Sequence, residues 1–360
     1  MRILHILNHI KQTGNGIVNV AIDVACEQAK AGHEVGVASA GGGYETLLSR
    51  YGVTHFELDQ TRKPLHLLKA ARRYRGIIAE FQPDIVHGHM MTGVVLARFL
   101  RGSAKYKLVS HIHNLYQRSS VLMGLAERVI SVSDAVATSM SKRGIPMGKM
   151  PVIKNCILGS HRLPALDTCT PKALEHPAIV TVAGMRRLKG ITELISAFEQ
   201  VAKSCPKAHL YLVGDGPDRQ MFEAQAAASS VGNRIHFEGF QKNPQAYMMA
   251  ADVFVLASHT ESFGLVLMEA RQVGCPIVAT SVDGIPEVLD HGKAGVLVPP
   301  KNAIALADQI EMLLASPSEQ DRLRRAARQN IEELTVTTMV EKITAVYHQL
   351  LRSSPVEYPS

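Results

Sequence analysis

The sequence is poor in aromatic residues, and this shortage narrows the functions it can have. Among 360 residues there is no tryptophan, and phenylalanine and tyrosine together make up 5%. Proteins that bind single-stranded nucleic acid usually stack the bases on aromatic side chains that are interleaved with basic ones. A nucleic-acid-binding protein therefore remains an alternative only because the net charge is +7.

Cysteine is also scarce, and no long apolar run occurs. The five cysteines are odd in number, scattered and without a Cys-x-x-Cys pair, so they offer no disulfide framework and suit a reducing compartment. No window of about 18 apolar residues could span a bilayer. The start of the chain turns polar too early for a signal peptide and indicates a strand instead. We therefore expect a cytoplasmic protein.

Positive charge is concentrated in the first half of the chain. Residues 1–165 contain 21 Lys and Arg against 10 Asp and Glu, a net charge of +11, whereas the remainder has 18 against 22, a net charge of −4. The segment 62–75 is strongly basic and carries Leu65, Leu68 and Ala71 at helical spacing. This asymmetry indicates either a solvated basic face or an anionic partner, such as an acidic membrane surface.

Short apolar runs alternate with amphipathic stretches along the whole chain. Continuous apolar strands between helices are typical of parallel sheets that are covered on both faces. In the first half, strands are predicted at residues 3–7, 34–38, 85–87, 108–110, 128–132 and 151–153. In the second half, they are predicted at 179–183, 208–213, 235–238, 253–257, 276–279 and 295–298. Helices are predicted at 18–31, 65–81, 134–143, 191–204, 218–229, 265–273 and 303–315.

The length favours two domains, and the prolines suggest where they are joined. Residues 161–177 contain three prolines and little periodicity, which predicts a linker. We expect an N-terminal domain over 1–160 and a second domain over 178–335. A last helix over 336–352 is expected to return to the first domain.

The segment from Glu261 to Glu269 is the most informative stretch of the sequence. Its two carboxylates flank seven residues, and it follows a predicted strand and opens a predicted helix. A helix N-terminus presents unpaired N–H groups that favour phosphate, and Gly264 allows a ligand to approach the backbone closely. A carboxylate would repel phosphate, so both glutamates should face hydroxyl groups. Phosphate together with many hydroxyls describes a sugar nucleotide.

In the context of residues 258–270, this spacing resembles the E-x7-E signature of family 4 glycosyltransferases, which are retaining enzymes of the GT-B fold. The resemblance implies an α/β protein with two Rossmann-like, doubly wound parallel-sheet domains that face a cleft. It also implies that Glu269 accepts from the ribose and that Glu261 is a catalytic residue at the sugar. The other donor contacts that it implies in this segment are Ser258, Phe263, Gly264 and Leu265.

Other segments of the second half resemble the donor site of the same family. Residues 186–190 resemble its Arg…Lys-Gly element, in which the cations reach the diphosphate; Lys189 matches clearly, and the arginine is Arg186 or Arg187. The remaining implied donor contacts are Gly214, Asp215, Gly216 and Phe240. No Asp-x-Asp pair occurs, so we expect no divalent metal and no cofactor, with positive groups stabilising the departing diphosphate.

Glycine and histidine motifs of the first half are interpreted in the same way. Gly14 and Gly16 resemble the glycine loop that faces the donor phosphates and the acceptor, although the family usually has a Gly-Gly pair there. His113, or alternatively His111, resembles the histidine that faces the reacting sugar. The histidine pairs at 87/89 and 111/113 could instead be structural or bind a metal.

These features predict a retaining glycosyltransferase that moves a hexose-type sugar from a nucleoside diphosphate sugar to an acceptor. The basic first domain favours a glycan or lipid-linked acceptor in lipopolysaccharide or cell-surface polysaccharide and glycolipid biosynthesis. The protein would then be peripheral on the inner face of the cytoplasmic membrane. A nucleotide-sugar 2-epimerase, which shares this layout, is the enzymatic alternative, and a basic nucleic-acid-binding protein is the other.

Overall fold

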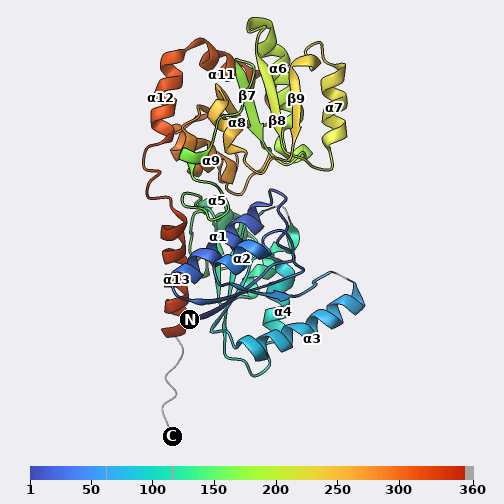
Figure 1. The fold of residues 1–360 in the computed structure, drawn as a ribbon, viewed down its shortest axis with the longest axis vertical. Coiled ribbons are helices and arrows are strands. Elements are labelled where there is room, and N and C mark those ends of the chain that lie inside the picture. Colours follow the sequence, from blue (N-terminus) through green and yellow to red (C-terminus); the bar gives the residue numbers. More distant parts are fainter. Residues whose placement is uncertain (62, 116, 353–360) are drawn as a thin grey trace. The chain divides into compact units, whose positions relative to one another are not determined.

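The computed structural model describes residues 1–61, 63–115 and 117–352, which form two α/β units (Figure 1). Unit 1 contains Met1–Arg162 together with the chain from Thr335 on, and unit 2 contains Leu163–Leu334. Arg62, which the sequence places in the basic segment, lies outside the described residues, as do Tyr116 and residues 353–360. Each unit is built on one six-stranded parallel sheet, which confirms the predicted doubly wound α/β fold class.

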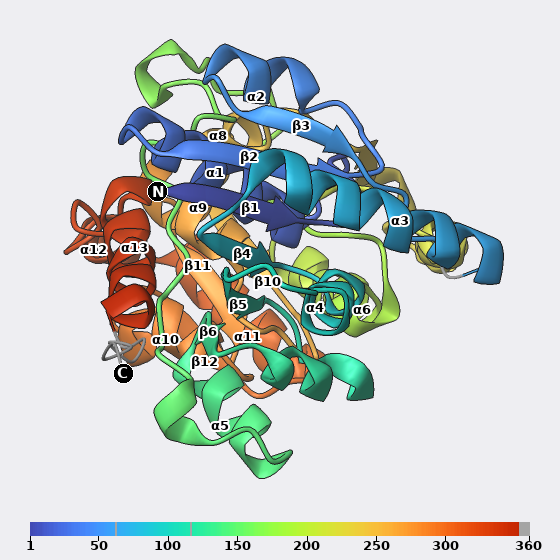
Figure 2. The same ribbon diagram turned by 90° about the horizontal axis from the view of Figure 1, so that it is seen from below.

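The sheet of unit 1 has the strand order β3-β2-β1-β4-β5-β6, which can be followed in Figure 2. Its strands are β1 (Arg2–Ile6), β2 (Glu34–Ser39), β3 (Thr54–Glu57), β4 (Ile85–Gly88), β5 (Lys107–Ile112) and β6 (Arg128–Ser131). Its helices are α1 (Gly16–Lys30), α2 (Glu45–Arg50), α3 (Pro64–Phe81), α4 (Met91–Phe99), α5 (Asp134–Lys142) and α13 (Val336–Arg352).

The helix α13 belongs to unit 1 although it follows all of unit 2 in the sequence. Its apolar residues recur at helical spacing and are buried, among them Val340, Ile343 and Tyr347. It packs against α1, whose N-terminus is capped by Asn15. Figure 1 shows α13 at the end of the chain beside α1 near its beginning.

The sheet of unit 2 has the strand order β12-β11-β10-β7-β8-β9. Its strands are β7 (Ala178–Val182), β8 (His209–Val213), β9 (Ile235–Gly239), β10 (Val253–Leu256), β11 (Ile277–Thr280) and β12 (Val296–Val298). Its helices are α6 (Ile191–Ser204), α7 (Arg219–Ala228), α8 (Gln245–Ala250), α9 (Leu265–Val273), α10 (Ile285–Val288), α11 (Ala303–Ala315) and α12 (Pro317–Ala327).

One sequence-based expectation for unit 1 is wrong in detail. Residues 151–153 are not a strand, since Val152 forms only an isolated bridge to Ser131. The sixth strand is instead β3 at the edge of the sheet. In α3 the buried side chains include Ala70, Tyr74 and Ile77, whereas Leu68 is 60% exposed and lies outside the core.

The segment predicted as a linker packs largely on unit 2. The backbone N–H of Lys172 donates to the carbonyl of Ala246, and the N–H of Glu175 donates to the hydroxyl of Tyr211. Among all described residues, no helix is long and apolar enough to cross a membrane. All five cysteines are free.

Candidate active site

The loops that carry the main predicted residues lie where the strand order of unit 2 reverses. The chain starts on β7, moves outward over β8 and β9, and then returns to β10 on the other side of β7. In open parallel sheets, ligands bind at the carboxyl ends of the strands at such a reversal. The loop after β7 contains Lys189, and the loop after β10 contains Glu261.

The structure brings Lys189 and Glu261 together. The Nζ of Lys189 donates to the Oε2 of Glu261, and their side chains are only 20% and 14% exposed. The pair is 72 residues apart in the sequence and joins the two loops at the reversal. An ammonium group has three N–H donors, so a bond to one carboxylate leaves Lys189 with two more for an anion.

Gly190 explains how the two loops come so close. It has a φ of 65°, in the left-handed region, and forms the N-cap of α6. A Cβ on this residue would lie 1.9 Å from the carbonyl oxygen of Ala257. Only glycine fits this approach, and the approach places Lys189 beside the end of β10.

Asp283 holds the Glu261 loop from its other side. Its Oδ2 accepts from the hydroxyl of Thr260 at 2.5 Å and from the backbone N–H of Glu261 at 2.9 Å. Gly284 next to it would place a Cβ 2.2 Å from the carbonyl oxygen of Ser262. The run that starts at Asp283 therefore fixes the loop after β10.

Helix α9 begins directly after this loop, and its N-terminus is open. Gly264 precedes it with a φ of 91° and, being a glycine, provides no side chain to cap its first N–H groups. Such groups and the helix dipole favour an anion. Phe263 is buried, and Leu265 is half-buried at the first helical position.

Glu269 lies one turn further along α9 and is buried, at 7% exposure. The neighbouring Arg271 is buried as well and donates to three backbone carbonyls, those of Val288, Ala327 and Gln329. Arg271 therefore fixes the far side of α9 on the last part of unit 2. Sequence reasoning did not find this arginine, because nothing in a helix interior marks which distant carbonyls it will reach.

The glycine turn after β8 packs backbone against backbone on the turn after β7. A Cβ on Gly214 would lie 2.0 Å from the carbonyl of Ala183, and one on Gly216 would lie 2.5 Å from that of Met185. The N–H of Met185 also donates to the carbonyl of Asp215 at 3.0 Å. Both positions therefore require glycine for close packing of the two turns, and this packing brings the Asp215 turn to the same edge of the sheet.

The other predicted residues of unit 2 are less constrained. Arg186 and Arg187 are both exposed, so the structure leaves the choice between them open. Phe240 follows β9 and is 43% exposed, which is unusual for a large apolar side chain. Ser258 follows β10 and is fully buried, and its Oγ has no hydrogen-bond partner among the described residues.

In unit 1, the predicted glycines lie at the N-terminus of α1. Gly14 has a φ of 68° in the loop after β1, and Gly16 is the first residue of the helix. The side chain of Asn15 accepts from the N–H of Ile17 at 3.0 Å, and the first turn contains no acidic residue. This helix start lies at the carboxyl end of β1, beside the reversal between β1 and β4.

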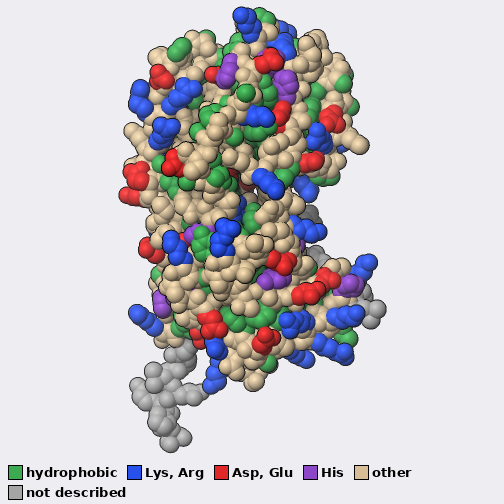
Figure 3. All heavy atoms as spheres, in the orientation of Figure 1, with side chains coloured by type: hydrophobic (Ala, Val, Ile, Leu, Met, Phe, Trp, Pro, Cys, Tyr) green, Lys and Arg blue, Asp and Glu red, His purple; other side chains and the backbone are tan. Residues whose placement is uncertain are grey.

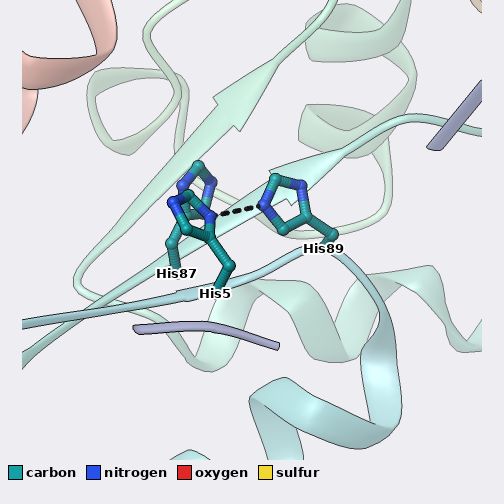
Figure 4. A group of neighbouring side chains, drawn as sticks. All are labelled: His5, His87 and His89. Carbon is teal, nitrogen blue, oxygen red and sulfur yellow. Dashed lines mark hydrogen bonds between the residues drawn. The ribbon is translucent and has the colours of Figure 1, made fainter. Parts of the chain in front are cut away.

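Histidines gather at the same edge of unit 1. They come from three adjacent strands or the residues just after them: His5, His87, His89, His111 and His113. The rings are close, with centroids 4.3 Å apart for 87 and 89 and 4.1 Å apart for 111 and 113. Figure 4 shows the three innermost rings facing one another. We call these residues the histidine cluster.

Hydrogen bonds fix where the protons of this cluster lie. The amide oxygen of Gln28 can only accept, so His5 donates to it through Nε2 at 2.8 Å. A neutral His5 then accepts at Nδ1 from Nε2 of His89, at 2.9 Å. His89 accepts in turn at Nδ1 from Nε2 of His113, at 3.1 Å. These three bonds point the same way, from His113 inward to Gln28.

Burial keeps these rings neutral. It lowers the pKa of His5 to about 4 and that of His113 to about 3. The pKa values of the other three rings are also lowered well below the usual value, first by burial and then by neighbouring histidines. No sequence pattern signals the full cluster, because His5 joins it from a strand 82 residues before His87, and only the pairs on β4 and β5 stand out.

Comparisons with known families agree with this architecture. Residues 14–157 match the family described as Glycosyltransferase Family 4, and residues 169–330 match the one described as Glycosyl transferases group 1. Together they cover most of both units.

Individual relatives cover different shares of the chain. The N-acetyl-alpha-D-glucosaminyl L-malate synthase of Bacillus anthracis is 31% identical over 48% of this chain, and the match spans about half of that relative, 46%. The lipopolysaccharide core biosynthesis glycosyltransferase LpsE of Rhizobium meliloti is 28% identical over 84% of both chains. The structure of HepE from Anabaena with UDP and glucose has the same fold, with a TM-score of 0.82 over 98% of this chain and 100% of HepE at 21% identity. The chain belongs to family 4 of the glycosyltransferases, which have the GT-B fold.

Proposed function

We propose that this protein is a retaining glycosyltransferase that moves a hexose-type sugar from a nucleoside diphosphate sugar to an acceptor without a divalent metal. The observation that carries the proposal is the Lys189–Glu261 pair at the strand reversal of unit 2, directly before the open N-terminus of α9. This arrangement offers cationic and N–H donors for phosphate beside carboxylates for hydroxyl groups. The UDP in the HepE structure and the pathway of LpsE support the same reading.

In this proposal each residue of unit 2 has a role. Glu269 accepts from the ribose hydroxyls, and Glu261 with the backbone around Gly264 holds the sugar. Lys189 and Arg186 stabilise the diphosphate as it departs, an electrostatic contribution of about 3–4 kcal/mol for a key donor. The turn at 214–216 and Phe240 line the nucleotide site. In unit 1, the roles proposed from the resemblance are contact with the donor phosphates and the acceptor for Gly14 and Gly16, and contact with the reacting sugar for His113.

The chemical step exchanges one bond at the anomeric carbon. The bond from this carbon to the diphosphate oxygen breaks, and a bond to the acceptor oxygen forms on the same face of the sugar. The acceptor hydroxyl proton passes to the departing phosphate, which becomes protonated as its negative charge develops. The protein supplies position and positive charge, so that neither a covalent enzyme intermediate nor a metal ion is needed.

We further propose that the acceptor is a lipid-linked or surface glycan and that α3 contacts an anionic membrane surface on the cytoplasmic side. Helix α3 exposes Leu68 and Leu67, at 60% and 36%, next to the exposed cations Lys69, Arg72 and Arg75. Figure 3 shows Lys and Arg side chains gathered over this helix. Exposed leucines beside basic residues are typical of a helix that lies in a membrane interface.

The donor can be tested by thermal shift with UDP-, GDP- and ADP-sugars. Ligand at 100 times its dissociation constant adds about 2.7 kcal/mol to the unfolding free energy, so the correct base should stand out. With that donor and a lipid-linked glycan, release of nucleoside diphosphate should require the acceptor. Stabilisation by no nucleotide sugar would contradict the proposal. Conversion of UDP-GlcNAc without acceptor would favour the epimerase.

A further inference from the structure

The histidine cluster of unit 1 has more nitrogen atoms than its hydrogen bonds use. Both ring nitrogens of His111 are buried and have no hydrogen-bond partner among the described residues, and the same holds for Nδ1 of His113 and Nε2 of His87. Burying a polar atom without a partner costs about 1–3 kcal/mol. His111 is fully buried and makes only ring contacts with neighbouring histidines. Packing alone would be served as well by an apolar residue.

We propose that His89, His111 and His113 form a binding site for a transition-metal ion of the Zn²⁺ type. One nitrogen from each of the three rings lies within 4.8 Å of the other two. Neutral imidazole is a good ligand for zinc, copper and cobalt, whereas magnesium prefers oxygen atoms. The inference rests on the contacts within this cluster. It shares His113 with the proposed function, but zinc binding is measured without donor or acceptor, so the two can fail separately.

The distances favour a shared ion between two of these rings. Nδ1 of His89 and Nε2 of His113 are 3.1 Å apart and are joined by one proton. Two nitrogens bound to one tetrahedral zinc at 2.0–2.1 Å lie about 3.3–3.4 Å apart. The metal would replace this proton, which moves to the unpartnered Nδ1 of His113. His111 can then supply a third nitrogen without losing any hydrogen bond, and a water molecule can take the fourth position.

The hydrogen-bonded chain behind the site provides the support that metal ligands need. A histidine that binds a metal usually donates its other N–H to a fixed acceptor, which sets the ring orientation. His89 already donates through Nε2 to His5, and His5 donates to Gln28. This chain leaves the lone pair of His89 Nδ1 directed at His113. Gln28 in turn donates to the hydroxyl of Tyr347 on α13.

The inner rings form a second candidate group for a metal ion, which the test must distinguish from the group of His89, His111 and His113. His5, His87 and His89 also have nitrogens within 4.8 Å of one another. However, His5 uses both of its nitrogens, and all three residues are buried. His113 is half-buried, so the group of His89, His111 and His113 is less enclosed than the inner group.

The test is a titration of tag-free full-length protein with Zn²⁺ by calorimetry and with Co²⁺ by its visible absorption. We expect one ion per chain, a tetrahedral cobalt spectrum, stabilisation of the fold by Zn²⁺ and no response to Mg²⁺. His111→Leu should weaken binding by roughly 100-fold or more, and His113→Ala should do the same. His5→Gln, which alters only the supporting chain, should weaken it by about 10-fold.

His236→Gln is the matched control, because His236 and His209 form a hydrogen-bonded pair in unit 2 at 2.9 Å. This variant should bind zinc as the wild type does. Circular dichroism checks that each variant is folded. The proposal is overturned if the wild-type protein binds no Zn²⁺, or if folded His111→Leu and His113→Ala proteins bind it unchanged. Loss of binding in His87→Leu but not in His111→Leu would assign the ion to the inner group and also overturn it.

Discussion

The two units have the same strand order but different chemistry at the carboxyl ends of their strands. In unit 2 this edge has an ammonium group, carboxylates and an open helix start within loops that glycines bring together. In unit 1 the same edge has five histidine rings, all kept neutral by burial. The sheet therefore determines where a site forms, and the residues that follow each strand determine what it can bind.

The two units also differ in net charge. The basic half of the sequence, with a net charge of +11, corresponds closely to the part of unit 1 before Arg162, and the rest has −4. The cations of unit 1 include those exposed on α3, whereas the key cation of unit 2 is partly buried against a carboxylate. Exposed cations such as those of α3 can act on an extended charged surface. A partly buried cation such as Lys189 can act on a single bound group.

Replacing Lys189 should have the largest effect. In the proposed function, Lys189→Ala removes positive charge from the position where the departing diphosphate gains negative charge, so turnover should fall by roughly 100-fold or more. Steady-state kinetics with the donor identified by thermal shift will measure this. Lys203→Ala, at the exposed far end of α6, is the matched control and should retain activity. Wild-type turnover in a folded Lys189→Ala protein would remove the role assigned to this residue.

Replacing the arginines of α3 tests whether the difference in charge between the two units matters for membrane binding. Each cation near an acidic lipid surface contributes about 1 kcal/mol, so changing Arg72, Arg73 and Arg75 to Gln should weaken vesicle binding by roughly 100-fold. Sedimentation with acidic and neutral vesicles measures it, and high salt should release the wild-type protein.

A matched triple replacement on α12 of unit 2, Arg322, Arg324 and Arg325 to Gln, removes the same charge. It should leave vesicle binding nearly unchanged if α3 is the contact. Equal binding of the wild-type protein to neutral and acidic vesicles would instead favour a soluble acceptor.

A smaller effect is expected at Glu269. Glu269→Ala should weaken binding of the free nucleoside diphosphate by at least about 10-fold, since one hydrogen bond to a charged group is worth about 1.5–3 kcal/mol. Calorimetry without sugar measures this, with Asp308→Ala on the exposed face of α11 as the control. Unchanged affinity would mean that Glu269 does not contact the ribose.

The smallest effect should come from chelation. Transfer should persist in excess EDTA, because in the proposed function cations of unit 2 take the place of a metal at the diphosphate. A loss of activity that Mg²⁺ or Mn²⁺ restores would contradict this. Zinc bound in the histidine cluster is a separate matter, because imidazole ligands do not favour either of those ions.

The sequence predicted the sheets of both units well because most strands are buried apolar runs. The predicted bounds of α9 and α11 agree with the structure, since Gly264 and Asn302 mark their starts. Strand β3 was missed because only Phe56 of its four residues is buried, so it lacks an apolar pattern. Residues 151–153 have the apolar pattern but form only one bridge.

The positions of the site residues in the fold were easier to predict than the residues that they contact. The loops that contain Lys189 and Glu261 follow strands, and a motif can place them at the edge of a sheet. Their direct contact depends on the close approach at Gly190, which involves Ala257 from a distant part of the chain. The direction of the hydrogen bonds in the histidine cluster depends on Gln28 and Tyr347, which no local pattern connects to it.

The position of α13 in unit 1 sets an order for events on the ribosome. Its buried residues cover a part of unit 1 that is otherwise complete once Arg162 has been made. The 172 residues of Leu163–Leu334 must be synthesised first, which takes about ten to thirty seconds at elongation rates of about 5–20 residues per second. Unit 2 is therefore the first to have its whole sequence available. Unit 1 therefore waits, with apolar surface on α1 uncovered, for the synthesis of α13.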